Sequence, residues 1–169
     1  MYTILYQPGA YGDLVTSIID RKDYEISSNR MIPNSERILA NKISSATTHK
    51  EIDIIYAEFA KEYKAISHHM FMYLILSKHD FILIDTSSDI DFEHCHTRAF
   101  TLDPSYHYKS LEHDKKRYIP LINNAKEKTN KIIRLHDILN GNLLVVLKQW
   151  IHTPLNEDIY AQFLSTKFT

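Results

Sequence analysis

Hydrophobic and polar residues recur with two different periods along the chain, and they predict an ordered series of strands and helices. Short runs of β-branched and aromatic residues that stop at turn residues are typical of strands. Apolar residues spaced three or four positions apart are typical of amphipathic helices. The predicted strands are 2–6, 64–67, 81–84 and 131–135. The predicted helices are 14–20, 35–39, 49–63, 70–78, 89–102, 118–128, 136–151 and 153–168, with polar connections at 21–34 and 103–117.

The alternation of strands and helices predicts an α/β fold built around a parallel sheet. Residues 81–84 form an unbroken apolar run, as expected of a parallel strand covered on both faces. In the helix that follows, Ile90, Phe92 and Phe100 are the candidates for the inner face. We see no repeat or linker, so residues 1–169 are expected to form one domain.

Composition narrows the class of protein and of partner. A net charge of −1 and a pI near 6.8 provide no basic field for nucleic acid or for an anionic membrane. The single cysteine, Cys95, excludes an internal disulfide and favours a reducing compartment. No run is long and apolar enough for a membrane span, and no secretory signal is recognisable at the N-terminus. We therefore expect a cytoplasmic protein, with unconventional export left open and the oligomeric state undetermined.

The strongest local signal is the glycine-bearing turn Gln7–Leu14, "QPGAYGDL", between the first strand and the first helix. The chain has three glycines, and two of them, Gly9 and Gly12, lie in this turn. Glycine permits a positive φ, and a helix start leaves amides unpaired beside the positive end of the helix dipole. The turn therefore suggests an anion or nucleotide cradle, although a plain tight strand-to-helix turn explains the same glycines. Asp13 stands where a helix N-cap is expected.

The turn lacks the phosphate-loop pattern G-x-x-x-x-G-K-[ST], because Asp13 follows Gly12 where a lysine would stand. An ordinary ATPase, GTPase or kinase is therefore disfavoured. In α/β folds ligands bind beyond the carboxyl ends of the strands, so the turns after residues 6, 67 and 85 are the places to examine.

Several segments resemble the sulfotransferase branch of the P-loop superfamily. "YTILYQPGAYGDLVTSII" resembles the first strand, loop and helix of small prokaryotic and phage-type relatives, whose loop reads P-G-x-x-G-x-x-[LV]. "AISHH" resembles the second strand, which ends near a catalytic base in this family. "DFILIDTSSDIDFEHCHTRAFTL" resembles the segment that binds the 3′-phosphate of the sulfate donor, and residues 131–168 resemble the closing segment.

The resemblance implies a three-layer α/β/α domain that binds 3′-phosphoadenosine-5′-phosphosulfate and transfers its sulfuryl group to an acceptor hydroxyl or amine. His68 or His69 would be the general base, and the acceptor is unknown. Residues 8–14 would wrap the 5′-phosphosulfate, and residues 86–88 would approach the 3′-phosphate. The implied cofactor-binding residues are Pro8, Gly9, Ala10, Tyr11, Gly12, Asp13, Leu14, Thr86, Ser87, Ser88 and Arg98.

The chain departs from the family pattern where cations are needed. The loop holds no basic residue, and Asp85 and Thr86 stand where the family has an arginine at the end of the third strand. Arg98, about three helical turns further on, is the remaining candidate cation. Sulfuryl transfer places charge on the leaving phosphate, which requires cationic or N–H stabilisation. A catalytically inactive binding module of the same fold, or a different nucleotide enzyme, is therefore an alternative.

The remaining candidate chemistry is weaker. The segment "EHCHTR" at 93–98 offers metal-ligand types, but His94 and His96 are two positions apart and a helix would splay them. We therefore predict no metal site. Ser87 and Ser88 lack a nucleophile-elbow pattern and also fit helix capping.

Overall fold

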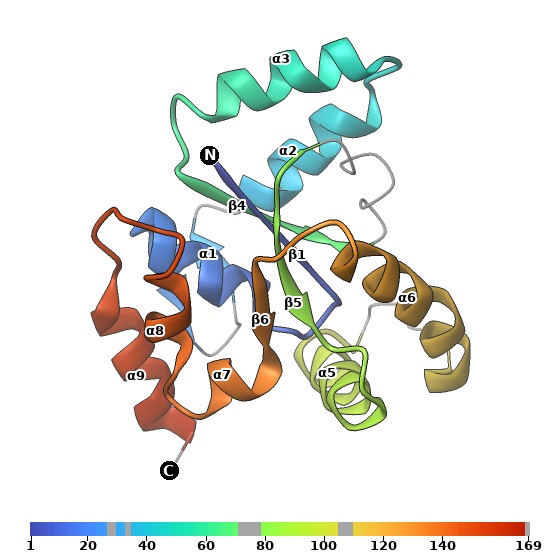
Figure 1. The fold of residues 1–169 in the computed structure, drawn as a ribbon, viewed down its shortest axis with the longest axis vertical. Helices are drawn as coiled ribbons and strands as arrows, with labels where there is room; N and C mark the ends of the chain where they lie inside the picture. Colours follow the sequence, from blue (N-terminus) through green and yellow to red (C-terminus); the bar gives the residue numbers. More distant parts are fainter. Residues whose placement is uncertain (27–29, 33–34, 71–78, 105–109, 168–169) are drawn as a thin grey trace.

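The centre of the molecule is a four-stranded sheet in the order β4-β1-β5-β6 (Figure 1). The computed structural model describes residues 1–26, 30–32, 35–70, 79–104 and 110–167. All neighbouring strands of this sheet run parallel. The strands are β1 (Tyr2–Tyr6), β4 (Ala65–His69), β5 (Ile82–Asp85) and β6 (Ile132–Arg134). The α/β class, the parallel sheet and the positions of these four strands confirm the prediction from sequence.

Helices flank the sheet, and their order follows most of the predicted pattern. They are α1 (Gly12–Asp20), α2 (Ser35–Ser44), α3 (His49–Phe59), α5 (Asp89–Leu102), α6 (Leu111–Lys126), α7 (Leu135–Leu139), α8 (Leu143–Leu147) and α9 (Glu157–Lys167). The helix predicted at 70–78 falls, except for Met70, outside the described residues. None of the helices in the described ranges combines the length and the apolar character that a membrane crossing needs.

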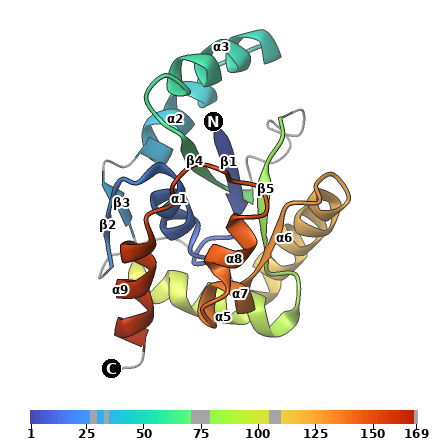
Figure 2. The ribbon, with the colours of Figure 1, turned by 60° about the vertical axis from the view of Figure 1, so that its left-hand side comes forward.

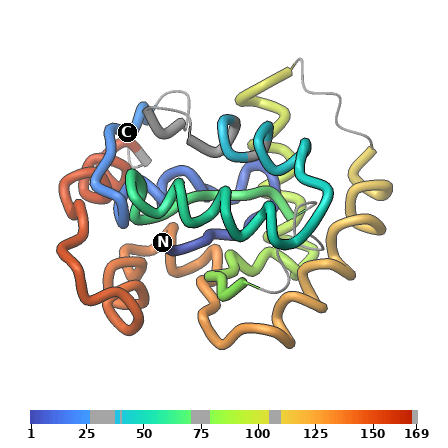
Figure 3. Tube along the Cα trace, turned by 90° about the horizontal axis from the view of Figure 1, so that it is seen from above, coloured from blue at the N-terminus to red at the C-terminus, as the bar shows by residue number. Residues whose placement is uncertain are grey.

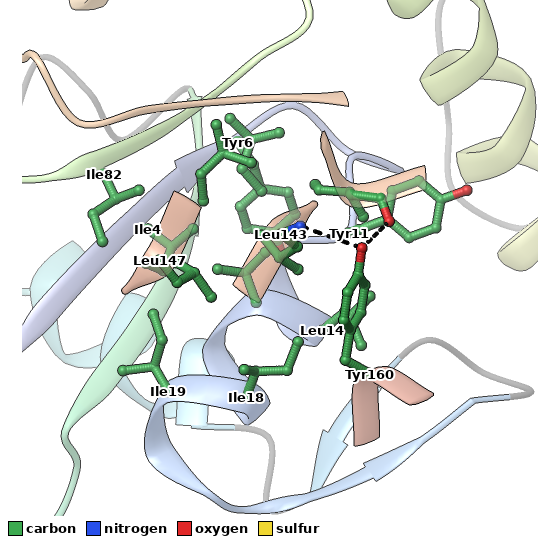
Figure 4. Packing of buried hydrophobic residues seen from close by; sticks show 14 of the residues in the cluster. Ile4, Tyr6, Tyr11, Leu14, Ile18, Ile19, Ile82, Leu143, Leu147 and Tyr160 are labelled. Atoms are coloured by element: carbon green, nitrogen blue, oxygen red, sulfur yellow. Dashed lines mark hydrogen bonds between the residues drawn. The ribbon is translucent and has the colours of Figure 1, made fainter. Parts of the chain in front are cut away.

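Alternation along the strands sends neighbouring side chains to opposite faces of the sheet. Ile4 and Ile82 join a core cluster with α1, α7, α8 and α9, which Figure 4 shows from close by. Leu5 and Leu83 join a second cluster with α2, α3 and α6. Figures 1 and 3 show α9 and α6 on opposite sides of the strands. The sheet is therefore covered by helices on both faces.

Two predicted connections contain regular structure. Within 21–34, β2 (Asp23–Glu25) and β3 (Arg30–Ile32) form an antiparallel pair, and Tyr24 packs against the α1 side of the core. The second predicted connection, 103–117, contains the start of α6 at Leu111. The Ser110 hydroxyl caps this helix by accepting a hydrogen bond from the His113 amide.

Pro120, placed near the start of the predicted helix at 118–128, instead lies inside α6. Its ring is on the exposed side of the helix. Tyr118, Ile122 and Ala125 are buried on the other side, and this burial holds α6 together despite the hydrogen bond that a proline removes.

Helix α5 lies across the carboxyl edge of the sheet, as Figure 2 shows. Of the residues expected on its inner face, Phe92 is fully buried, whereas Ile90 is 82% and Phe100 54% exposed. Cys95 and Ala99 are buried instead. The prediction is wrong for Ile90 and Phe100 because the helix rests on the loop after β1, so small residues are needed where the backbones approach closely.

Candidate functional site

The strand order changes direction at β1, which makes the carboxyl end of this strand the natural place for a ligand. The chain passes from β1 to β4 on one side and later crosses to β5 on the other. In open α/β sheets ligands bind in the crevice at such a switch point. Here the crevice is bounded by the loop after β1, residues 7–11, and the turn after β5, residues 86–88.

The backbone of the loop turns through two left-handed positions. Gly9 has φ +86°, and Tyr11, which precedes α1, has φ 64° and ψ 23°. A bulky residue with positive φ is uncommon, and strained conformations of this kind gather at functional sites. The predicted N-cap is wrong, because α1 already begins at Gly12 and Asp13 lies within its first turn. The Asp13 carboxylate instead accepts a hydrogen bond of 2.8 Å from the Ser67 hydroxyl of β4.

Both glycines of the loop lie against other parts of the protein. A Cβ atom on Gly9 would lie 2.1 Å from the carbonyl oxygen of Cys95 in α5. A Cβ atom on Gly12 would lie 2.3 Å from the ring of Tyr6. The glycines are therefore required by the close packing of the loop on α5 and on β1, whether or not an anion binds there.

The main-chain amides of this loop are mostly uncommitted. The Ala10 amide donates to the Gln7 carbonyl over 3.0 Å. Across the described residues, no main-chain acceptor is found for the amides of Gly9, Tyr11 and Gly12. Gly12 is the first residue of α1, where the dipole favours negative charge. The loop therefore retains the donors that an anion site needs.

Helix α5 brings a cation to the loop. The Arg98 guanidinium donates to the Gly9 carbonyl oxygen over 2.9 Å and lies over the Tyr11 ring, 3.7 Å from its centroid. Phe163 of α9 also packs edge-on against the Tyr11 ring, with 5.4 Å between the ring centroids. The Tyr11 hydroxyl and the His94 ring nitrogen are 3.2 Å apart. Burial raises the pKa of Tyr11, although Arg98 opposes the shift, so the hydroxyl stays protonated at neutral pH.

A hydrogen bond between Gln7 and Thr86 joins the loop after β1 to the turn after β5. The Thr86 hydroxyl donates to the Gln7 side-chain oxygen over 2.7 Å, and the Gln7 side-chain nitrogen donates to the Phe92 carbonyl over 3.2 Å. Gln7 and Thr86 are 2% and 0% exposed. Thr86, expected near a phosphate, therefore joins β5 to β1. No role was predicted for Gln7, although its place directly after an apolar strand could have indicated one.

Ser87 and Ser88 have local partners. The Ser87 hydroxyl donates to Asp85 over 2.7 Å and accepts from Lys126 over 3.1 Å. Lys126 also pairs with the Asp85 carboxylate at 2.8 Å. Burial tends to raise the pKa of Asp85, but its bonds with Lys126 and Ser87 outweigh burial and lower it. Ser88 caps α5, because its hydroxyl accepts from the Asp91 amide over 3.1 Å.

The cap makes a specific prediction. Replacing Ser88 with alanine is expected to lower the free energy of unfolding by about 1 kcal/mol, because the first turn of α5 loses its side-chain acceptor. Aspartate at the same position restores the acceptor and should recover most of the loss. Urea unfolding followed by circular dichroism measures both variants. Equal stability of all three proteins would show that the cap contributes nothing.

The two candidate bases occupy different environments. His68 is fully buried, and its Nε2 lies 3.1 Å from the hydroxyl of Tyr56 in α3. Burial and, to a lesser extent, the neighbouring His69 lower the pKa of His68 to about 3. His69 is half-buried at the end of β4, with its ring packed edge-on against Tyr6 at 4.8 Å. Burial lowers the pKa of His69 to about 4, although Asp13 opposes the shift. Both imidazoles are therefore neutral at pH 7.

The other histidines near the site lie on α5 and point in different directions. His94 contacts Tyr11, whereas the His96 Nε2 lies 3.3 Å from the Asp114 carboxylate of α6. No three metal-ligating side chains converge among the described residues.

The structure shows a small cavity beside the loop after β1. A cavity of about 10 Å³, lined by Gln7, Pro8, His96, Asp114 and Tyr118, has room for about one water molecule. A wider hollow of about 270 Å³ lies elsewhere, between α2 and α3, and is lined by Lys42, Ser45, Ala46, Glu51, Ile54 and Ile55.

Comparison with known proteins identifies no family. The chain matches no protein-family model, no curated protein and no solved structure. The functional argument therefore depends on the geometry at the carboxyl end of β1.

Proposed function

We propose that this protein is a binding module of P-loop, sulfotransferase-like architecture, and that residues 8–14 bind the phosphate group of a nucleotide. The observation that carries the proposal is the set of uncommitted amides at Gly9, Tyr11 and Gly12, at the start of α1 and beside the Arg98 guanidinium. Amides at a helix start together with a nearby guanidinium form an anion site without a loop lysine. A ligand of the type of 3′-phosphoadenosine-5′-phosphosulfate fits this chemistry.

We expect a nucleotide that binds at the loop to displace α5. The helix backbone contacts Gly9, and the cavity beside Gln7 and Pro8 holds about one water molecule. Binding therefore shifts the position of α5 relative to the loop. This cost makes modest affinity the expectation, because part of the binding free energy is used to open the crevice.

Binding is favoured over catalysis because of the histidines. His68 has no exposed surface, and its Nε2 is already paired with Tyr56 on the α3 side of the sheet. A general base must reach the proton that it removes, within hydrogen-bond distance or through one water molecule. His68 does not meet this condition in the folded protein.

Calorimetry with adenosine 3′,5′-bisphosphate, ATP, GTP and adenosine tests the proposal. We expect the bisphosphate to bind in the micromolar range and adenosine to give no heat, because the loop recognises the phosphate. The absence of heat with all three phosphorylated nucleotides would overturn the nucleotide site and leave a module that acts through other surfaces.

The Asp13 carboxylate provides a variant that leaves the glycines intact. Asp13→Asn removes a negative charge from the first turn of α1 and keeps an oxygen that accepts from Ser67. We expect bisphosphate affinity to rise several-fold, since repulsion of the incoming anion is removed. Asp53→Asn on α3, at the far end of the molecule in Figure 1, is the matched control and should leave the affinity unchanged. Equal affinities of the two variants would place the bisphosphate away from the loop.

A sulfuryl transferase that uses His69 is the second candidate. His69 is paired with Tyr6 in the strand register, so it lies at the same sheet edge as the loop. A neutral imidazole can accept the proton of an acceptor hydroxyl. Transfer of labelled sulfate from 3′-phosphoadenosine-5′-phosphosulfate to a panel of hydroxyl and amine acceptors, lost in His69→Gln, would favour this candidate over the binding module.

A further inference from the structure

We propose that Arg98 is the main cationic contact for the bound anion, and that the guanidinium exchanges the Gly9 carbonyl oxygen for an anionic oxygen when a phosphate or sulfate group enters. The inference rests on the proposed function and deepens it, since it names the group that supplies the charge. The same exchange removes one of the hydrogen bonds between the loop and α5.

The hydrogen-bond partners of Arg98 among the described residues are neutral groups. The guanidinium donates to a neutral carbonyl oxygen, that of Gly9, over 2.9 Å. It also hydrogen-bonds with the Tyr24 side chain. No ion pair between Arg98 and a carboxylate is formed within the described part of the chain. The lysines at this sheet edge differ, since Lys126 is paired with Asp85 and Lys115 with Asp89. Arg98 therefore carries a positive charge that an anionic ligand can match.

The Arg98 guanidinium also contacts the Tyr11 ring. Its central carbon lies 3.7 Å from the Tyr11 ring centroid, so the ring restricts the half-buried side chain. Burial raises the pKa of Tyr24 strongly, so the hydroxyl beside Arg98 is neutral and does not compete as an anion. A planar guanidinium held in this way offers paired N–H donors that match two oxygens of a phosphate or sulfate group.

An anionic oxygen would replace the Gly9 carbonyl oxygen as the acceptor for Arg98. Hydrogen bonds between a guanidinium and an anionic oxygen are stronger than those with a neutral carbonyl. The Gly9 carbonyl belongs to the same loop as the amides proposed to bind the anion, so the anion and the carbonyl would compete for Arg98. Ligand binding would thus replace the Arg98–Gly9 bond, one of the contacts between the loop and α5, while the bond between Gln7 and Phe92 stays in place.

Calorimetry with adenosine 3′,5′-bisphosphate on three variants tests the role of Arg98. Arg98→Gln removes the charge and is expected to weaken binding by about tenfold or more. Arg98→Lys keeps the charge without the planar guanidinium. Its affinity for the bisphosphate should lie between those of the parent and Arg98→Gln proteins. Arg117→Gln is the matched control, because Arg117 also lies near a tyrosine ring, 5.2 Å from the centroid of Tyr118, and is exposed on α6. The control should bind like the parent protein.

A measurement on the unmodified protein keeps the proposal testable if Arg98→Gln unfolds. The Nε–H signal of Arg98 in ¹⁵N-labelled protein should shift during titration with the bisphosphate and with inorganic pyrophosphate, and the Gly9 amide should shift with it. Binding of equal strength in the parent and Arg98→Gln proteins, or an unmoved Arg98 signal at saturation, would overturn the role of Arg98 alone. No binding by the parent protein would overturn the proposed function as well.

Discussion

Replacing Gly9 with alanine is expected to lower the free energy of unfolding by about 2 to 5 kcal/mol. A residue with a side chain at a positive φ costs about 1 to 2 kcal/mol, and overpacking costs about 1 to 3 kcal/mol more. Both costs apply here, since Gly9 has φ +86° and its Cβ would lie 2.1 Å from the Cys95 carbonyl oxygen. That oxygen belongs to the backbone of α5 and cannot rotate away. Urea unfolding measures the effect.

Gly141 is the matched control for this substitution. It has φ +88°. Among the described atoms, a Cβ atom on Gly141 would contact only the Leu164 side chain, at 3.9 Å. Gly141→Ala therefore carries the backbone cost of about 1 to 2 kcal/mol without the collision. The difference between the two variants isolates the contact of the loop with α5. Equal losses at both positions would show that α5 yields, and that the loop is more loosely held than the structure indicates.

We expect acid to destabilise this protein through both His68 and His69, and the part that comes from His68 should be measurable as a slope of stability against pH. The pKa of His68 is lowered from 6.5 to about 3 in the folded protein. Between pH 6.5 and 4 the unfolded chain therefore binds a proton at His68 that the folded protein does not. Stability present above pH 6.5 is then lost by about 1.4 kcal/mol for each pH unit below it, or about 3 kcal/mol at pH 4.

Unfolding by urea at several pH values, with His68→Gln, tests this assignment. Glutamine does not titrate and can still accept a hydrogen bond from Tyr56, so the variant should have the flatter dependence of stability on pH. His152→Gln is the matched control, since it replaces an exposed imidazole outside the core. Equal slopes in the parent and His68→Gln proteins would mean that His68 already takes up a proton in the folded state.

Part of the candidate site was accessible from sequence because it depends on neighbours in the chain. The strand at 2–6, the glycines that follow it and the start of a helix lie within one short stretch. The capping role of Ser88 was recognised as an alternative for the same reason. The roles of residues that depend on contacts between distant parts of the chain were predicted less well. Gly9 is needed because of Cys95, and Arg98 reaches the loop only because α5 folds back across it.

The sequence by itself determined the alternation of strands and helices, the parallel sheet and the position of the glycine loop. These features follow from the periods of hydrophobic residues and from the limited conformations of the backbone, both of which are local. Only the tertiary structure decided that His68 is buried beside Tyr56, that Thr86 bonds to Gln7, and that Arg98 faces the loop. Exposure, pKa and hydrogen-bond partners depend on residues far apart in the chain, which meet only when the core packs.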